Sequence, residues 1–332
     1  MGKADAAVRN WLSDKRRFAD LFNGVIFSGR EVVTADELEE QKGEASVLVP
    51  DKAGGTRPVQ KYRDIVMRWN GKMDLMLLAV ESQDKIHYAM PVRNMLYDGL
   101  EYAEQVRLRN KQRRIKYHSS EEFLSGFGKN DRLYPVITLV FYYDTKGWDG
   151  AKSLYDMMGL REDDEKHSLL RPYIPDYHIN LVDAGNMRST EYFHTDLHEV
   201  MGMLKYRGDK EGLQKYIKEN SSYFSNLDKD SYFAVGSFLK SKRLMKKIDA
   251  AGQGKERHLD MCKAIEDLYE DGIEKGIEKG IEKGIEKGIV QGKRDTALNL
   301  KKMGMAAEQI AQAVGETAGI VREWLSEANA AK

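Results

Sequence analysis

The sequence has little cysteine and no long apolar run. Its 332 residues include one cysteine, Cys262, so no intramolecular disulfide can form, which fits a reducing compartment. The longest apolar run, at 135–143 (PVITLVFYY), is far shorter than the about 20 residues that a membrane-spanning helix needs. The first residues also lack the apolar core of a signal peptide. We therefore expect a cytoplasmic protein that contacts no membrane.

Net charge is absent as well, because 53 lysines and arginines balance 53 aspartates and glutamates. The overall charge therefore indicates no partner, and a nucleic-acid surface would have to be a local patch. What the chain does have is a hydrophobic fraction of 41%, which is enough for a core and excludes global disorder. Its length allows one large domain with a smaller appendage, or two modest domains.

The order of apolar patterns predicts an α/β domain. Residues 8–27 space their apolar side chains as an amphipathic helix does. Two strands, at 62–69 and 74–83, are expected to pair through the Asn70-Gly71 turn. The further elements expected are a helix from His87 to about Lys116, a buried strand at 135–143, a helix near 150–159 and a strand near Ile179–Val182. This order favours a mixed central sheet flanked by helices over a helical bundle.

Beyond residue 205 the chain becomes helical in character and strongly charged. The run at 272–289 repeats Gly-Ile-Glu-Lys, and each glycine costs about 1 kcal/mol in a helix. Each Glu–Lys pair stabilises the helix by only about 0.2–0.5 kcal/mol. We therefore expect a marginal helix that serves as a linker or orders on association. The regions expected are a nuclease-like domain at 1–205, a helical region at 206–270, a repeat linker at 271–292 and a small helical element at 293–332. Homo-oligomers would form through this C-terminal part.

Asp64 and Glu81 stand out because the expected hairpin would bring them together. Carboxylates at the ends of adjacent strands can converge on one Mg²⁺ ion, which prefers oxygen ligands, and Mn²⁺ can substitute. Gln83 lies two residues after Glu81 and so on the same side of a strand, where it can orient water or contact a phosphate. Such a metal supplies hydroxide near neutral pH and neutralises charge on the phosphorane. An acidic residue about 17 positions before (D/E)-x-(K/Q) is the pattern of the PD-(D/E)XK nuclease core.

The same stretch resembles a known family. Residues 60–105 (QKYRDIVMRW…LLAVESQDKIHYAMPVRNMLYDGLEYAEQ) and 134–154 (YPVITLVFYYDTKGWDGAKSL) are similar to the recombination-promoting nucleases (Rpn), also labelled transposase-like, of the PD-(D/E)XK superfamily. The similarity covers roughly residues 10–205, and the Gly-Ile-Glu-Lys run is similar to that family's variable tail. The resemblance implies a restriction-endonuclease-like core and Mg²⁺-dependent DNA cleavage linked to recombination or mobile elements.

The resemblance also assigns roles by position. Asp64 and Glu81 would bind the metal, and Gln83 would replace the usual lysine. A neutral glutamine removes a charge that could stabilise the transition state, so cleavage is expected to be slow or conditional. The alternative is a catalytically silent DNA-binding or assembly protein on the same fold, although such a descendant need not have kept all three residues. Nothing favours the 2′-hydroxyl recognition that an RNA-directed nuclease would need.

Other acidic and histidine residues offer weaker candidates. Asp144-Thr145-Lys146 matches (D/E)-x-K with its lysine intact, but its upstream acid, Asp131, lies in a polar loop, so Glu81 is preferred. Asp20 is either a further acid near the metal or, preferably, a solvated helix carboxylate. His194 and His198 have the spacing of a zinc pair, yet the residue after His194 is a threonine, and a surface helix is the better interpretation.

A basic stretch at 107–116 offers a DNA surface. It contains six cations and no acid, which is more than matching a helix dipole requires, and a contact with the DNA backbone is an equally good interpretation. Its DNA-binding candidates are Arg107, Arg109, Lys111, Arg113 and Arg114. Residues 308–325 have the spacing of a helix-turn-helix, but acids outnumber bases there, so we interpret them as a protein–protein element.

Overall fold

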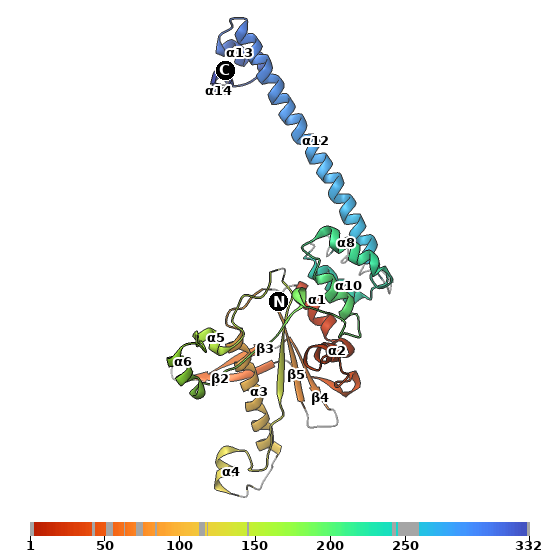
Figure 1. Ribbon diagram of the computed structural model, residues 1–332, viewed down its shortest axis with the longest axis vertical. Helices are drawn as coiled ribbons and strands as arrows, with labels where there is room; N and C mark the ends of the chain where they lie inside the picture. Colours follow the sequence, from red (N-terminus) through yellow and green to blue (C-terminus); the bar gives the residue numbers. More distant parts are fainter. Residues whose placement is uncertain are drawn as a thin grey trace. The chain divides into compact units, whose positions relative to one another are not determined.

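The computed structural model describes residues 3–41, 44–50, 56–62, 64–70, 76–83, 85–112, 117, 119–144, 146–240, 244 and 259–330. The chain divides into two compact units, Met1–Lys263 and Ala264–Lys332. The first unit mixes helices and strands, and the second is helical (Figure 1). The expected α/β class with a helical C-terminal region is therefore confirmed.

A five-stranded mixed sheet forms the centre of the first unit. Its strand order is β1-β4-β5-β6-β7, with antiparallel pairs from β1 to β5 and parallel pairs from β5 to β7. A separate hairpin pairs β2 with β3. The strands are β1 (Leu38–Gln41), β2 (Glu44–Pro50), β3 (Thr56–Tyr62), β4 (Ile65–Trp69), β5 (Met76–Gln83), β6 (Val136–Tyr142) and β7 (Asn180–Asp183). The predicted antiparallel pairing of two strands, here β4 and β5, is confirmed, while the expected turn at Asn70-Gly71 lies partly outside the described residues. Strands β1 to β3 were not expected.

Strand β6 is apolar at nearly every position because helices cover both faces of the sheet. Phe141 packs toward Phe238 of helix α10 (Lys229–Phe238), with ring centroids 6.4 Å apart. Val140, which alternates with it, packs in one cluster with Met90 of helix α3 (Met90–Gln112). Successive strand residues point to opposite faces, so a strand between two helical layers needs apolar side chains at every position. This explains the longest apolar run of the sequence.

The N-terminal segment forms two helices where one was expected. Helix α1 covers Lys3–Leu12 and helix α2 covers Lys15–Ile26. Asp14 begins the second helix, because its carboxylate accepts hydrogen bonds from the backbone nitrogens of Arg16 (3.0 Å) and Arg17 (3.2 Å). A capping aspartate satisfies the free N–H groups of a new helix start, which interrupts the first helix. The prediction of one continuous helix at 8–27 was therefore wrong.

The remaining helices of the first unit are short. The expected helix near 150–159 begins only at Leu154, because Ser153 and Asp156 form a capping box. Among the described residues from β5 to Lys240, the α-helices other than α3 and α10 are α4 (Ser120–Ser125), α5 (Leu154–Met158), α6 (Glu165–Leu170), α7 (Leu197–Leu204), α8 (Lys210–Glu219) and α9 (Ser221–Phe224). None of the described helices of the chain combines the length and the apolar character that crossing a lipid bilayer requires.

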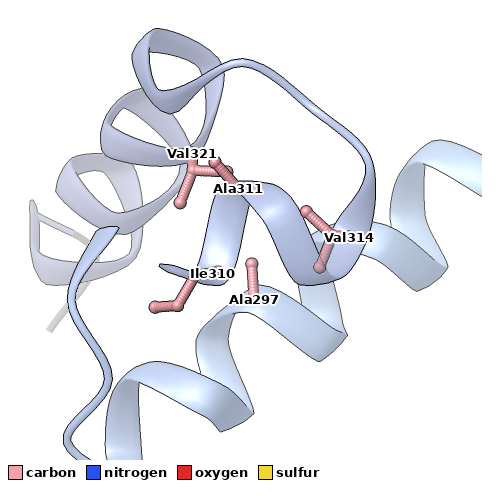
Figure 2. Close-up of a cluster of buried hydrophobic side chains, with 5 residues drawn as sticks. All are labelled: Ala297, Ile310, Ala311, Val314 and Val321. Atoms are coloured by element: carbon pink, nitrogen blue, oxygen red, sulfur yellow. The ribbon is translucent and has the colours of Figure 1, made fainter. Parts of the chain in front are cut away.

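The second unit contains a small three-helix cluster. Helices α13 (Ala307–Val314) and α14 (Ala318–Ala330) pack with the end of α12 (Met261–Lys302). Figure 2 shows the five buried side chains that meet there, which are Ala297, Ile310, Ala311, Val314 and Val321. Gly315 has a φ of 66°, a left-handed conformation that glycine adopts without strain, and it ends α13.

The Gly-Ile-Glu-Lys repeat lies inside α12 and is helical along its whole length. Its isoleucines stay 55–58% exposed at positions 277, 281, 285 and 289. No heavy atom lies near the place where a Cβ would stand on Gly276, Gly280 or Gly284. The repeat is therefore a helix whose apolar stripe faces no other described part of the chain.

Candidate functional site

The backbone register brings the three proposed catalytic positions together. Strands β4 and β5 are antiparallel with Ile65 paired to Val80, so the register continued by one residue sets Asp64 opposite Glu81. Asp64 is partly buried and takes part in an interaction with the rest of the chain. The backbone of Gln83 follows two residues later at the end of β5, while the side chains of β5 lie outside the described residues. Continued in this way, the register would place positions 64, 81 and 83 at the same end of the hairpin.

Further polar groups gather where the parallel strands end. Strands β5, β6 and β7 run in the same direction, so their carboxyl ends share one edge of the sheet, and Gln83 pairs there with Tyr142. The Asp144 carboxylate accepts a hydrogen bond from Lys240 Nζ at 2.9 Å. The Asp183 carboxylate accepts one from the backbone nitrogen of Trp148 at 3.2 Å. In open α/β sheets, ligands bind in the crevice at this edge.

Arg207 is a cation at the same edge that sequence reasoning missed. A Cβ built on Gly185 would lie 3.5 Å from both Arg207 Nη2 and the Asp144 carbonyl oxygen. Burial lowers the pKa of Arg207, against the attraction of Asp144, Tyr142 and Asp183. Its two terminal nitrogens have no hydrogen-bond partner among the described residues. Nothing in the local sequence (KYRGD) distinguishes this arginine from an exposed one.

The competing motif at Asp144 and Lys146 is not assembled. Asp131 precedes β6 and Asp144 follows it, so the two carboxylates lie at opposite ends of a seven-residue strand. At about 3.3 Å per residue, that strand separates them by roughly 20 Å, which is too far for one cation. Asp131 instead accepts a hydrogen bond from the Gly128 nitrogen at 2.7 Å. This geometry favours Glu81 over the alternative.

Asp20 is buried, which contradicts the solvated carboxylate that was preferred. Its side chain is only 5% exposed. The carboxylate accepts hydrogen bonds from the backbone nitrogens of His194 (2.9 Å) and Thr195 (2.7 Å) and from the Thr195 hydroxyl (2.6 Å). Because these donors lie before α7, Asp20 joins α2 to a loop almost 175 residues later in the chain. The role that this geometry supports is structural.

The two histidines do not share a helix face, because His194 precedes the start of α7 at Leu197. Nε2 of His194 lies 3.1 Å from the Gly29 carbonyl oxygen, and Nδ1 of His198 lies 2.8 Å from that of Thr190. Each ring therefore has its own backbone partner, and the expected surface helix holds only His198. Within the described residues, no three histidine, cysteine, aspartate or glutamate side chains group closely enough to hold a metal.

The positive charge of the basic stretch at 107–116 is partly compensated by a neighbouring carboxylate. Arg107 forms a two-fold hydrogen-bonded ion pair with Glu104, at 2.6 Å for each contact, and this pair lowers the pKa of Glu104. Arg109 donates to the Tyr134 hydroxyl at 2.9 Å. Lys111 is exposed, while Arg113 and Arg114 lie outside the described residues. The acid that compensates Arg107 stands one turn before the stretch, so counting charges within 107–116 alone overlooked it.

A buried ion pair that the sequence analysis also missed anchors α2. Arg17 is 9% exposed and donates from Nε to Asp196 at 2.7 Å and from Nη2 to Asp228 at 2.8 Å. Burial disfavours its charge, but the hydrogen bonds and attraction of these two carboxylates outweigh it and raise the pKa of Arg17. Arg17 lies four residues before Leu21, on the apolar face of the helix, which is the one signal that could have indicated it.

Asp196 is the centre of this network. It also accepts hydrogen bonds from the Trp11 indole nitrogen (3.3 Å), the Tyr223 hydroxyl (2.8 Å) and the Ser231 hydroxyl (3.0 Å). Burial, together with the charge of Asp196, raises the pKa of Tyr223. The network ties α1 and α2 to α9 and α10, and so fixes the helices that cover one face of the sheet.

Comparison with known proteins identifies no relative. No family model, curated protein or solved structure matches this chain. The function therefore has to be inferred from the residues and the backbone register of the site itself.

Proposed function

We propose that this protein is a Mg²⁺-dependent DNA endonuclease that hydrolyses phosphodiester bonds, with Asp64, Glu81 and Gln83 as catalytic residues. The observation that carries the proposal is the pairing of Ile65 with Val80, a register that sets Asp64 opposite Glu81 when it is continued by one residue. Directly opposite residues of antiparallel strands have Cβ atoms about 4.5–5.5 Å apart, which suits two carboxylates that share one cation. Two carboxylates are also the donor set that Mg²⁺ prefers, and Mn²⁺ can substitute for it.

The arrangement of the sheet supports the same proposal. An antiparallel hairpin, β4 and β5, is followed by helix α3 and by a parallel strand, β6. This is the order that a restriction-endonuclease-like core of the Rpn type requires. The proposal therefore also includes a role in recombination or in mobile elements. We place the DNA backbone along the end of α3 and the residues that follow it in the sequence, where the cations are Arg107, Arg109, Lys111, Arg113 and Arg114.

Each residue has a distinct task in the proposed reaction. Asp64 and Glu81 bind the cation, which when bound supplies a hydroxide nucleophile and neutralises phosphate charge. The Gln83 amide oxygen accepts a hydrogen bond from the attacking water and orients it. Because the amide is neutral, it adds no positive charge to stabilise the transition state. The proposal therefore includes slow cleavage.

A second candidate is a silent DNA-binding or assembly protein on the same fold, and Gln83 in the place of a lysine is what favours it. The two are separated by incubating supercoiled plasmid with the purified protein in Mg²⁺, in Mn²⁺ and in a chelator. We expect nicked and linear plasmid with either metal and none with the chelator. Plasmid that binds the protein and stays supercoiled in both metals would establish the silent alternative.

A further inference from the structure

The exposed isoleucines of α12 belong to a row of residues spaced four apart, whose members are Ile277, Ile281, Ile285, Ile289, Lys293 and Ala297. The chain itself covers the C-terminal end of this row. Ala297 is 0% exposed and packs in one cluster with α13 and α14 (Figure 2), and Lys293 Nζ forms an ion pair with Glu316 at 2.7 Å. The four isoleucines remain 55–58% exposed. The row is therefore a surface on which helices pack, and only its end is covered among the described residues.

A row of glycines runs beside the isoleucines and is equally open. No heavy atom apart from adjacent residues and the helix's own backbone lies within 4 Å of a Cβ placed on Gly276, Gly280, Gly284, Gly288 or Gly292. Glycine weakens a helix, and helices in proteins are stabilised mostly by packing an apolar face against a partner. A second helix that covers both rows would therefore supply the stabilisation that the repeat lacks by itself.

The spacing of the rows determines how two such helices would cross. Because a repeat has four residues and a helical turn has 3.6, the rows advance by about 40° for each 6 Å of rise, in the sense of the helix itself. A repeat longer than 3.6 residues makes paired helices wrap around each other in the right-handed sense. Glycines in the contact allow the two backbones to approach closely. The surface therefore fits a close, right-handed crossing with another helix.

The charged residues of the repeat determine the orientation of that helix. Around α12 the rows follow in the order Gly, Ile, Glu, Lys, so glutamates flank the isoleucine side of the Gly/Ile face and lysines flank its glycine side. Two-fold symmetry of a parallel pair sets the isoleucines of each helix against the glycines of the other, and the glutamates of each beside the lysines of the other. An antiparallel pair would instead set glutamates beside glutamates and lysines beside lysines. Flanking charges of this kind select the partner and the orientation of paired helices.

We propose that α12 binds a second copy of this chain as a parallel, right-handed pair of helices, in which each isoleucine row packs on the glycine row of the partner subunit. The second copy is the occupant because the surface is complementary to itself in shape and in charge, and because it continues a row that already packs against helices at Ala297. The inference is independent of the proposed catalysis, since the Gly/Ile face lies wholly within the second unit.

The test of the surface uses the full-length chain and two substitutions in the repeat. Ile281→Asp places a carboxylate in the contact. Gly284→Leu fills the glycine row with a side chain that favours a helix more than glycine does. Leu124→Asp, at a side chain of α4 that is 88% exposed, makes a similar apolar-to-acidic change elsewhere and is the control. Sedimentation equilibrium measures the dissociation constant, and circular dichroism measures helix content.

We expect the wild type to form dimers. Ile281→Asp and Gly284→Leu should each raise the dissociation constant roughly 10- to 100-fold, because each removes the burial of about one isoleucine. Helix content should be no lower in Gly284→Leu than in the wild type at equal dimer fraction. The control should dimerise as the wild type does.

The orientation is tested with spin labels on cysteines substituted for Lys279 and for Gln291, one at a time, in a Cys262→Ser background. Both positions are exposed and lie twelve residues apart in the lysine row. A parallel pair gives similar distances between the subunits at the two positions. An antiparallel pair separates at least one pair of labels by about 18 Å along the helix axis.

Several results would overturn the inference. A monomeric wild type, an assembly larger than two chains, or a dimer that Ile281→Asp leaves intact would show that the Gly/Ile face does not form the pair. Tighter association of Gly284→Leu would indicate unspecific apolar contact in place of packing on the glycines. Equal weakening by Leu124→Asp would show that the effect does not belong to this surface, and unequal label distances would exclude the parallel orientation.

Discussion

Asp64 and Glu81 are the two side chains on which catalysis should depend most directly. Asp64→Ala and Glu81→Ala are each expected to abolish plasmid cleavage and to leave the melting temperature close to that of the wild type. Their effects should not add, because either substitution empties the same cation site. Glu40→Ala, at an exposed carboxylate of β1, is the matched control and should cut normally. Cleavage by the double variant at the wild-type rate would remove both residues from the mechanism.

Gln83 decides how fast the proposed enzyme is. Gln83→Lys should cut at least as fast as the wild type, because a cation near the phosphate stabilises the transition state, and Gln83→Ala should cut more slowly. The measurement is the initial nicking rate at saturating Mg²⁺. Equal rates for all three proteins would mean that this side chain takes no part. Asp144→Ala tests the competing motif in the same assay, and only the loss of its Lys240 ion pair is expected.

Arg17 should matter for stability far more than its neighbour. Arg17→Ala leaves the buried carboxylate of Asp196 without its cation, which typically lowers the free energy of unfolding by about 3–5 kcal/mol. Arg16→Ala removes an exposed cation and should change that free energy by less than about 0.5 kcal/mol. Urea unfolding of both variants measures the difference. Equal values would show that the network adds nothing to stability.

The same network predicts an acid dependence of stability. Burial alone would raise the pKa of Asp228, but hydrogen bonds from Ser231 and Arg17 outweigh it and lower that pKa. A carboxyl whose pKa is lower in the folded state stabilises the fold above its unfolded pKa of about 3.9 and loses this contribution as the pH falls through the folded value. The urea midpoint should therefore fall as pH drops below about 4. The fall should be shallower in Asp228→Asn.

At the scale of elements, the periodicity of apolar residues predicted the strands whose pattern is local in the sequence. It missed the strands that form only because they pair with a distant strand. The apolar run of β6 and the pairing of β4 with β5 were both predicted, because burial on two faces leaves a clear mark in the sequence and an Asn-Gly pair is a signal for a turn between two strands. Strand β1 (LEEQ) carries three polar residues out of four and exists because it pairs with β4. Pairing of this kind is a tertiary effect that no short pattern records.

The candidate site shows the same division. Asp64 and Glu81 were found because two apolar stretches separated by a turn signal predict a hairpin, while the register that sets the two positions opposite each other, with Trp69 paired to Met76, comes from the structure. Arg207 was not, since its significance lies in burial without a hydrogen-bond partner among the described residues, which only the folded chain reveals. Asp20 was misjudged because the backbone donors that bury it lie far away in the sequence, near Thr195. The residue types around a position and their spacing cannot indicate contacts with residues so far away in the sequence.

The end of α3 should behave as a phosphate-binding element. Each phosphate contact contributes about −0.9 to the slope of log affinity against log salt, so substituting four arginines of 107–114 by glutamine should flatten the slope by about 3 to 4 units. The four residues are Arg107, Arg109, Arg113 and Arg114, tested in a Glu81→Ala background to prevent cutting. Weakening should be similar for all DNA sequences, because phosphates carry no base information.

A matched control distinguishes a DNA contact from general loss of charge. Replacing four lysines at or near α8 by glutamine removes the same net charge from another element, and these are Lys205, Lys210, Lys215 and Lys218. We expect this variant to keep most of the wild-type slope. If both variants flatten it equally, DNA is attracted by overall charge and α3 has no special role. If neither does, the DNA path lies elsewhere on the molecule.

For the whole molecule, the boundary after Lys263 divides the unit that holds the proposed catalytic site from the unit proposed to mediate assembly. A chain that ends at Lys263 is expected to retain metal-dependent cleavage, because the site lies in the first unit, and to have a smaller assembly mass by light scattering. The physical reason is the exposed isoleucine stripe of α12, which a sister chain would bury. An unchanged mass would count against assembly through this region. Lost cleavage would show that catalysis requires the second unit.

The tetrapeptide repeat of α12 also has a consequence for inheritance. A tandem repeat can gain or lose whole units when its coding DNA is copied. Each added unit of four residues would lengthen the helix by about 6 Å and advance its phase by about 40°. Because the repeat stays in frame and its side chains are exposed, such a change would disturb no buried contact of the cluster around Ala297. The length of this helix can therefore change in fixed steps of four residues without altering the buried cluster around Ala297.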